Sequence, residues 1–183
     1  MPTNPDSLAS IRVRKLTPGD DRSSFRSGDV DLDRFFSRYA GQNQFRHHVG
    51  TTYVAVDSRG DIKGFATVAA SELAPRTITS VRRSRLPGYP LPVLRLARLA
   101  AAESSQGHGV GALLLRAVFA LAQTMSSEIG CVGVVVDAKP DAISFYAKLG
   151  FVPLEVEAGE LGDRPAPRPM FLEIGQIGSG SHP

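Results

Sequence analysis

Hydrophobic and polar positions along the chain follow two different periods. Apolar residues at every second position, or in short unbroken runs, predict strands, and apolar residues spaced three or four apart predict helices. Helical spacing occurs at 32–40 and 110–125, and a third helix is expected to begin near Pro140 and to end at Gly150. Strand patterns cover 11–16, 53–57, 62–70, 93–101, 131–136, 151–154 and 170–174. The predicted order is therefore β-α-β-β-β-α-β-α-β-β.

Specific side chains are expected in the core of this arrangement. The first helix presents Leu32, Phe35, Phe36, Tyr39 and Ala40 at helical spacing, which indicates core aromatics rather than a cofactor site. The second helix is expected to face the sheet with one apolar stripe, formed by Val110, Leu113 or Leu114, Ala117 or Val118, Leu121 and Met125.

The overall composition indicates a single soluble domain. Of the 183 residues, 42% are hydrophobic and 21% are charged, which is ordinary for a soluble protein. We expect the domain to span 11–175, between a disordered N-terminus at 1–10 and a flexible tail at 176–183. No leader sequence is evident, and the longest apolar segment, 110–122, is too short for a bilayer and contains Arg116. These features predict a cytoplasmic protein without a membrane partner.

Disulfide and metal chemistry are not expected. Cys131 is the one cysteine, so the chain has no intrachain disulfide, and its place at the head of an apolar strand predicts a buried side chain rather than a nucleophile. His47 and His48 are adjacent rather than at the spacing of metal ligands, so we predict no metal site.

A glycine-rich turn separates the strand at 93–101 from the helix at 110. Its sequence is Gln106-Gly107-His108-Gly109-Val110-Gly111, followed by Ala112. Glycine lets the backbone approach a ligand and reach positive φ, and the first N–H groups of a helix lie unpaired at the positive end of its dipole. The combination predicts a cradle for a phosphate or pyrophosphate. The alternative is a turn that serves only the tight packing of strand and helix.

Two common phosphate-binding loops do not match this turn. A P-loop needs Lys and then Ser or Thr after its last glycine, whereas Ala112 and Leu113 stand here. A dinucleotide-binding fold carries its glycines after the first strand, whereas this loop lies beyond the middle of the chain. The spacing Gln-x-x-Gly-x-Gly instead resembles motif A of the GNAT family of N-acetyltransferases, and the segment 145–151, FYAKLGF, resembles the end of motif B of that family.

The resemblance to GNAT enzymes implies a fold, a co-substrate and a set of binding residues. The fold is α/β, with a mixed, mostly antiparallel sheet of six to seven strands flanked by about four helices. The co-substrate is acetyl-CoA, whose pyrophosphate the motif A loop surrounds. The cofactor-binding residues implied in this chain are Leu99, Ala101, Gln106, Gly107, His108, Gly109, Val110, Gly111 and Ala112.

Arginine is concentrated in two parts of the chain. The formal net charge is only +3, but all except four of the 21 basic residues are arginine, the side chain suited to bidentate phosphate contacts. Residues 73–102 contain six arginines and no acid, and a second basic group follows the start of the first helix. Such a stripe is typical of a nucleic-acid partner. The alternatives are a solvated face or a bed for the 3′-phosphate of CoA.

Further short motifs narrow the resemblance. They are spread over roughly 11–175 and include Phe25-x-x-Gly28, Ala40-x-Gln42-Asn43, Arg98-Leu99-Ala100 and Val136-Asp137-Ala138. The set resembles the TacT/AtaT-type toxins of bacterial type II toxin–antitoxin pairs. This resemblance implies acetylation of the α-amine of aminoacyl-tRNA, which blocks translation, and silencing by a ribbon–helix–helix antitoxin. It also implies a homodimer that reaches operator DNA only through the antitoxin complex.

The arginine stripe and this resemblance together suggest residues that bind tRNA. We expect this contact from Arg38, Arg82, Arg83, Arg85 and Arg98.

The chemistry of amine acetylation assigns roles to three residues. The thioester oxygen gains charge as the neutral amine attacks, and backbone N–H groups of Leu99 and Ala101 are the expected donors to it. The thiolate leaving group needs a proton, and Tyr146 is the expected general acid, as the aligned tyrosine is in the family. The alternative for Tyr146 is a buried ring whose hydroxyl bonds to a backbone carbonyl. The α-amine of an aminoacyl ester is weakly basic, so no dedicated general base is assigned.

Two other functions are also compatible with the sequence. One is a GNAT enzyme that acetylates a small molecule or a protein amine, for which activity would depend little on salt. The other is a non-catalytic acyl-CoA-binding or interaction module, which would bind CoA without acetyl transfer.

Overall fold

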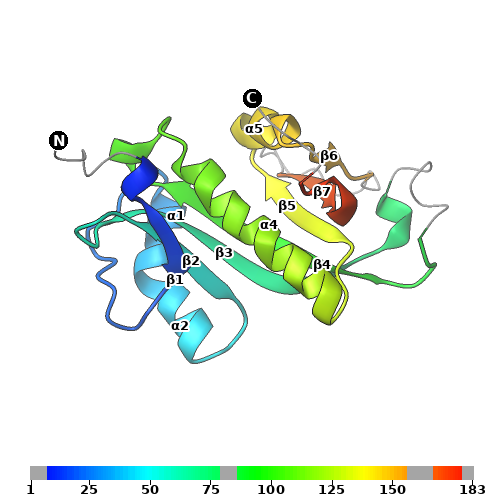
Figure 1. Cartoon of the computed structure of the whole chain (residues 1–183), viewed down its shortest axis with the longest axis horizontal. Coiled ribbons are helices and arrows are strands. Elements are labelled where there is room, and N and C mark those ends of the chain that lie inside the picture. The colour runs from blue at the N-terminus through cyan, green and yellow to red at the C-terminus, as the bar shows by residue number, and fades with distance from the viewer. Residues whose placement is uncertain (1–7, 79–85, 156–166, 179–183) are drawn as a thin grey trace. The chain divides into compact units, whose positions relative to one another are not determined.

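The computed structural model describes residues 8–78, 86–155 and 167–178. Seven strands form one sheet in the order β1-β2-β3-β4-β5-β7-β6, and Figure 1 labels each of them. The pair β4–β5 is parallel, and the pairs β1–β2, β2–β3, β5–β7 and β6–β7 are antiparallel. The predicted mixed and mostly antiparallel sheet is therefore confirmed.

The order of elements also agrees with the prediction from hydrophobic spacing. Along the chain the elements are β1 (Arg12–Lys15), α1 (Val30–Arg34), α2 (Ala40–Phe45), β2 (Thr51–Val56), β3 (Ile62–Leu73), β4 (Leu91–Ala101), α4 (Val110–Glu128), β5 (Gly133–Ala138), α5 (Ile143–Lys148), β6 (Val152–Pro153) and β7 (Arg168–Glu173). Short 3-10 turns occur at Leu8–Ser10, Pro75–Thr77, Glu103–Ser105, Pro140–Ala142 and Ile174–Gln176. The turn at Leu8–Ser10 lies inside the N-terminus for which disorder was expected, whereas 1–7 and 179–183 lie outside the described residues.

The chain forms two compact units, and the first comprises residues up to 69 together with 97–118. Its core is built on aromatic rings from the first helix and β3. Phe36 stacks on Phe65 with 4.2 Å between ring centroids, and Phe25 meets both rings edge-on. Asp29 caps α1 by accepting hydrogen bonds from the N–H groups of Asp31 and Leu32. The expectation of core aromatics is therefore confirmed for Phe35 and Phe36, which are buried.

Tyr39, which was also expected in this core, is 46% exposed. The cause lies in the backbone, because Phe35–Tyr39 forms a π-helical segment between α1 and α2. A π-helix has more residues per turn than an α-helix, so it shifts the residues that follow away from the α-helical spacing. The expected core position of Tyr39 is therefore wrong, and its ring faces solvent.

Helix α4 begins directly after the glycine-rich turn and runs from the first unit into the second. Val110, Leu114, Leu115, Val118 and Ala122 are its buried residues, whereas Leu121 and Met125 of the expected stripe are only partly buried. A Cβ on Gly64 of β3 would lie 2.8 Å from Val110 Cγ1, so the helix packs closely on that strand. By length and composition α4 is apolar enough to cross a membrane, but a single helix of this kind is weak evidence for a membrane span.

The second unit comprises 70–96 and the residues from 119 onward. Its core contains Leu73, Ile78, Leu91, Val93, Val135, Leu154 and Phe171. The parallel register pairs Leu94, Arg95 and Leu96 with Val134, Val135 and Val136. Cys131 is buried, as expected, and its thiol donates to the carbonyl of Gly133 at 3.3 Å.

Gly133 offers a test of the packing of β5 against β7. A Cβ at this position would overlap the carbonyl oxygen of Leu172 and lie 2.5 Å from Phe171 Cε2. We predict that Gly133→Ala lowers the free energy of unfolding by roughly 1–3 kcal/mol through overpacking. Gly175→Ala is the control, because a Cβ there meets no described atom within 4 Å. Equal denaturant midpoints for the two variants would contradict this account of the contact.

Candidate active site

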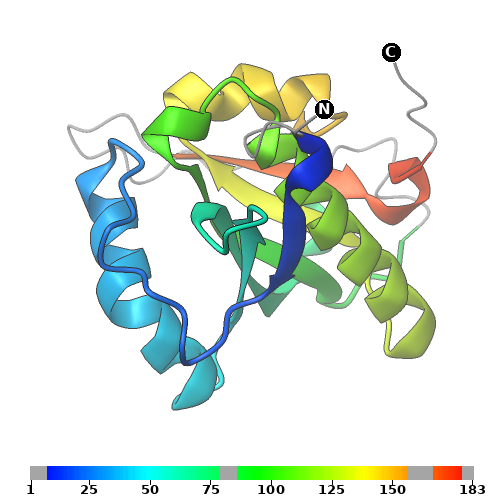
Figure 2. The ribbon, with the colours of Figure 1, turned by 60° about the vertical axis from the view of Figure 1, so that its left-hand side comes forward.

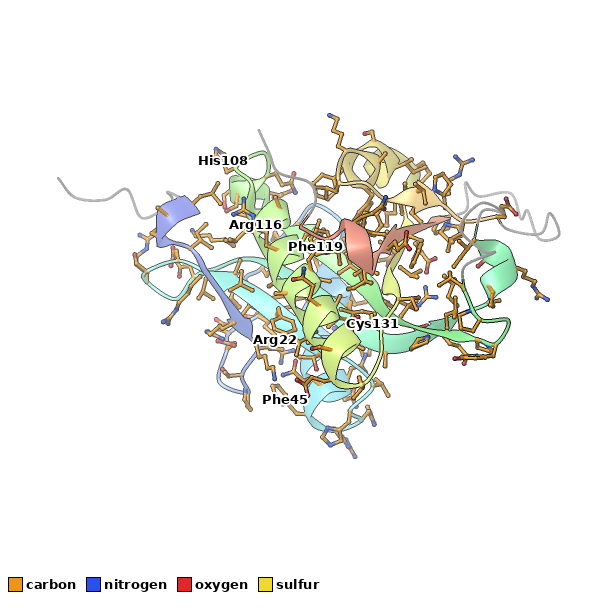
Figure 3. All side chains as sticks on the ribbon, turned by 45° about the vertical axis from the view of Figure 1, so that its right-hand side comes forward. Arg22, Phe45, His108, Arg116, Phe119 and Cys131 are labelled. Atoms are coloured by element: carbon orange, nitrogen blue, oxygen red, sulfur yellow. The ribbon has the colours of Figure 1, made fainter. Side chains whose placement is uncertain are left out.

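The glycine-rich turn has the backbone conformation that a phosphate-binding loop requires. Gly107 and Gly109 have φ values of 76° and 83°, in the region that favours glycine. A Cβ on Gly107 would meet no described atom within 4 Å, so the space beside this residue is open. A Cβ on Gly109 would lie 2.8 Å from Leu8 Cδ1, so the N-terminal turn covers the other side of the loop. His108 lies exposed between the two glycines, at the tip of the loop (Figure 3).

The first residues of α4 add N–H groups that can donate hydrogen bonds to a ligand beside this loop. Leu113 N–H donates to Gly109 O at 3.0 Å, which is the first bond of the helical pattern. The N–H groups of Val110, Gly111 and Ala112 therefore precede the bonded part of the helix and lie at the positive end of its dipole. The loop glycines and these N–H groups fit a diphosphate, and all of them belong to the first unit.

Strand β4 carries two further candidate donors at its end. Ala102 N–H donates to Lys63 O of β3 at 2.8 Å. Because successive N–H groups alternate between the two edges of an extended chain, the N–H groups of Ala101 and Leu99 point to the edge away from β3. These two N–H groups are the ones expected from the sequence to donate to the reacting thioester oxygen.

Gln106 differs from the other expected cofactor-binding residues because its side chain is bound to the protein. Its Nε2 donates to Ser27 O at 2.7 Å and to Ala101 O at 3.3 Å. Glu103 N–H donates to Arg26 O at 2.9 Å beside it. Sequence reasoning did not assign Arg26 or Ser27 to the site, because nothing in local spacing connects them to a loop nearly eighty residues away. The fragment Phe25-x-x-Gly28 was the only signal that pointed to this segment.

Tyr146 belongs to α5 in the second unit. Its ring meets Phe145 and Phe151 edge-on, with centroid distances of 5.2 and 5.4 Å, and the residue is only 6% exposed. Burial raises the pKa of Tyr146 to about 12, so the phenol is a proton donor at neutral pH. Among the residues that the structure describes, the phenol has no hydrogen-bond partner, so none of their backbone carbonyls binds it.

The arginines expected to bind tRNA have different surroundings. Arg38 is exposed on the π-helical segment. Arg98 stacks on Phe35, with its Cζ 4.3 Å from the ring centroid, and donates to Ala97 O at 3.2 Å. Arg95, in the same basic stretch of sequence, pairs with Asp137 at 2.5 Å. Arg82, Arg83 and Arg85 lie outside the described residues.

Comparisons with known proteins agree with this geometry. The family model of the acetyltransferase (GNAT) domain matches residues 48–153, more than half of the chain. A "tRNA-acetylating toxin" of Mycobacterium tuberculosis (strain ATCC 25618 / H37Rv) is 32% identical over 140 residues, which cover 75% of this chain and 82% of that protein.

Two solved structures show the same fold. AtaT complexed with acetyl-methionyl-tRNAfMet superposes with a TM-score of 0.79 at 24% identity, covering 91% of this chain and 96% of that one. A tyrosine-to-phenylalanine mutant of AtaT, bound to the C-terminus of the antitoxin AtaR and to acetyl-CoA, superposes with a TM-score of 0.72 at 22% identity, covering 92% and 96%. Together with the loop and strand geometry, these matches show that the chain belongs to the GNAT family of acetyltransferases, which take their acetyl group from acetyl-CoA.

Proposed function

We propose that this chain is a bacterial toxin that acetylates the α-amine of aminoacyl-tRNA and thereby blocks translation. The observation that carries the proposal is the 32% identity, over three quarters of the chain, to a protein named for acetylating tRNA. The complex of AtaT with an acetylated methionyl-tRNA supports the same class of acceptor, on a shared fold. The site of action is then the cytoplasm, where charged tRNA is used.

The exposed arginine on the first helix supports an RNA acceptor. Arg38 belongs to a basic group that also includes Arg34, Arg46, His47 and His48. Arg34 is paired with Asp31 at 2.5 Å, and its charge is therefore partly offset. Among the residues that the structure describes, Arg38 has no carboxylate partner, so its guanidinium remains available to a phosphate.

The mechanism uses backbone donors and one side chain. Acetyl-CoA supplies an activated acetyl thioester. The N–H groups of Gly107 and Gly109, with those at the start of α4, hold its diphosphate, and the N–H groups of Leu99 and Ala101 donate to the thioester oxygen as it gains charge. The acceptor amine forms the new C–N bond while the C–S bond breaks. Tyr146 gives its proton to the departing thiolate, the amine loses one proton to solvent, and the phenolate of Tyr146 then recovers a proton from solvent.

A toxin of this kind is expected to have a protein partner that inhibits it. AtaT is bound by its antitoxin AtaR in a solved structure, and we infer an antitoxin of the ribbon–helix–helix class for this chain. We further propose that the enzyme is a homodimer and that it reaches operator DNA only within the antitoxin complex.

Transfer of labelled acetyl groups tests the acceptor directly. We predict that labelled acetyl-CoA labels charged tRNA, and that deacylated tRNA and free amino acids stay unlabelled, because the reacting amine belongs to the aminoacyl ester. The measurement is acid-precipitable label with and without mild alkaline deacylation, which releases an acetylated amino acid.

Each other outcome favours one of the alternatives. Label on a small amine or on protein, with none on RNA, would make the chain a GNAT enzyme of another acceptor. Acetyl-CoA binding without transfer to any acceptor would indicate a non-catalytic module.

The contact between Arg38 and tRNA can be tested through its salt dependence. We predict that Arg38→Ala weakens binding of charged tRNA and makes the log–log salt slope shallower by about one, as the loss of one phosphate contact requires. Arg59→Ala is the matched control, since the Arg59 guanidinium is exposed but lies 3.5 Å from Asp61 and 3.7 Å from Asp57. Equal slopes for Arg38→Ala and the unaltered chain would remove Arg38 from the interface.

The acid role of Tyr146 predicts a change in turnover rather than in binding. We expect Tyr146→Phe to lower kcat by about 100-fold or more while acetyl-CoA affinity is retained. A general acid must be protonated to act, and with a pKa of about 12 the phenol stays protonated throughout the neutral and mildly alkaline range. Ionisation of Tyr146 therefore causes no loss of kcat in that range.

Tyr53→Phe provides the control for Tyr146→Phe. Burial also raises the pKa of Tyr53, but this residue lies on β2 in the first unit and has no assigned role. A Tyr146→Phe enzyme that turned over as fast as the Tyr53→Phe enzyme would eliminate the phenol as the acid.

A further inference from the structure

Two segments that are distant in the sequence meet beside the phosphate-binding loop. One is Arg26–Ser27, before α1, and the other runs from the end of β4 to Gln106. The side chain of Gln106 donates to Ser27 O at 2.7 Å and to Ala101 O at 3.3 Å. The backbone of Glu103 donates to Arg26 O at 2.9 Å. Both segments belong to the first unit, in which Figure 2 shows the chain before α1 rising toward this loop.

The chemistry of the amide fixes what Gln106 does. A primary amide nitrogen has two N–H donors, and a backbone carbonyl can only accept. Since both partners are carbonyls, the nitrogen end of the amide must face them. The donors of Gln106 are therefore committed to the protein backbone and are not offered to the diphosphate of the cofactor.

The contact at Ser27 continues into the first helix. Ser27 N–H and Ser27 Oγ both donate to Asp33 Oδ1, at 2.8 and 2.6 Å, and Ser27 is only 9% exposed. Asp33 N–H in turn donates to Asp29 O at 2.9 Å, within the capped first turn of α1. A chain of hydrogen bonds thus runs from Gln106 through Ser27 to Asp33.

We propose that Gln106 is a positioning residue that couples acetyl-CoA binding to the ordering of the first turn of α1. A ligand that fixes the loop also fixes Gln106, and through Ser27 it holds Asp33 and the turn around it. Coupling is reciprocal, so an ordered first turn also strengthens cofactor binding. The π-helical segment with Arg38 follows α1 directly, so cofactor binding prepares this helix for the acceptor. The inference rests on acetyl-CoA as the ligand of the loop and does not depend on tRNA as the acceptor.

Amide hydrogen exchange with and without acetyl-CoA tests this coupling. In the unaltered chain, acetyl-CoA is expected to slow exchange in the loop 107–112 and also at Asp31, Leu32 and Asp33. In Gln106→Met, which keeps side-chain length but removes both donors, protection of the loop should remain and protection of the α1 turn should be lost. We expect the dissociation constant of acetyl-CoA to rise about fivefold to tenfold in this variant, because the coupling to α1 no longer contributes to the free energy of binding.

Gln44 supplies a matched control. Its side chain also bridges two backbone groups of the first unit, donating to Leu16 O at 3.0 Å and accepting from Thr52 N–H at 2.7 Å. Gln44→Met therefore removes the same kind of bond away from the loop. It should lower stability to a similar extent and leave the cofactor-induced protection of α1 as in the unaltered chain.

Three results decide the proposal. Absence of α1 protection in the unaltered chain, or equal α1 protection in Gln106→Met, would overturn it. Should Gln106→Met fail to fold, Asp33→Ala removes the acceptor of both Ser27 bonds and must also reduce protection of Asp31 and Leu32. The readout uses acetyl-CoA alone, so an enzyme that showed this coupling but did not acetylate tRNA would refute the proposed function and leave this inference intact.

Discussion

The loop before α4 depends on a backbone conformation that only glycine reaches at low energetic cost. The positive φ values at Gly107 and Gly109 turn the chain so that successive N–H groups converge with those at the start of the helix. The other candidate donors, Leu99 and Ala101, are also backbone groups. A backbone N–H group has no side-chain rotamer, so the direction in which it points is set by the contacts of the surrounding backbone. In the first unit, those surroundings are the pairing of β4 with β3, the close packing of α4 on Gly64 and the bonds made by Gln106.

Fewer arginines are available to an external anion than the number of arginines in the chain suggests. Arg98 stacks on Phe35, Arg95 pairs with Asp137, and Arg14 pairs with Asp20 at 2.7 Å. Each of these guanidinium groups already has a partner within the fold, which lowers its attraction for an external phosphate. An exposed residue such as Arg38 therefore contributes more to long-range attraction of an anion than the average arginine of this chain.

Hydrophobic spacing predicted the order of strands and helices because each element buries one face against a sheet, and burial imposes a period. The glycine spacing predicted the tight turn before α4, because the positive φ values there admit few residues other than glycine. The π-helical segment at Phe35–Tyr39 could not be predicted, since it breaks the period on which the prediction rests, and Tyr39 was misplaced as a result. The side-chain bond of Gln106 was equally inaccessible, because its acceptor lies on a distant segment and is a carbonyl that every residue possesses. Residue type alone also gave no indication that Arg98 stacks on an aromatic ring.

Cys131 gives the second unit a built-in reporter of local opening. Its side chain is 4% exposed and its thiol is hydrogen-bonded to Gly133, at the start of β5. Because the chain contains one cysteine, any reaction with a thiol reagent comes from this position. The labelling rate of the unaltered chain therefore measures how often the backbone around Cys131, just before β5, becomes accessible, with no engineered cysteine needed.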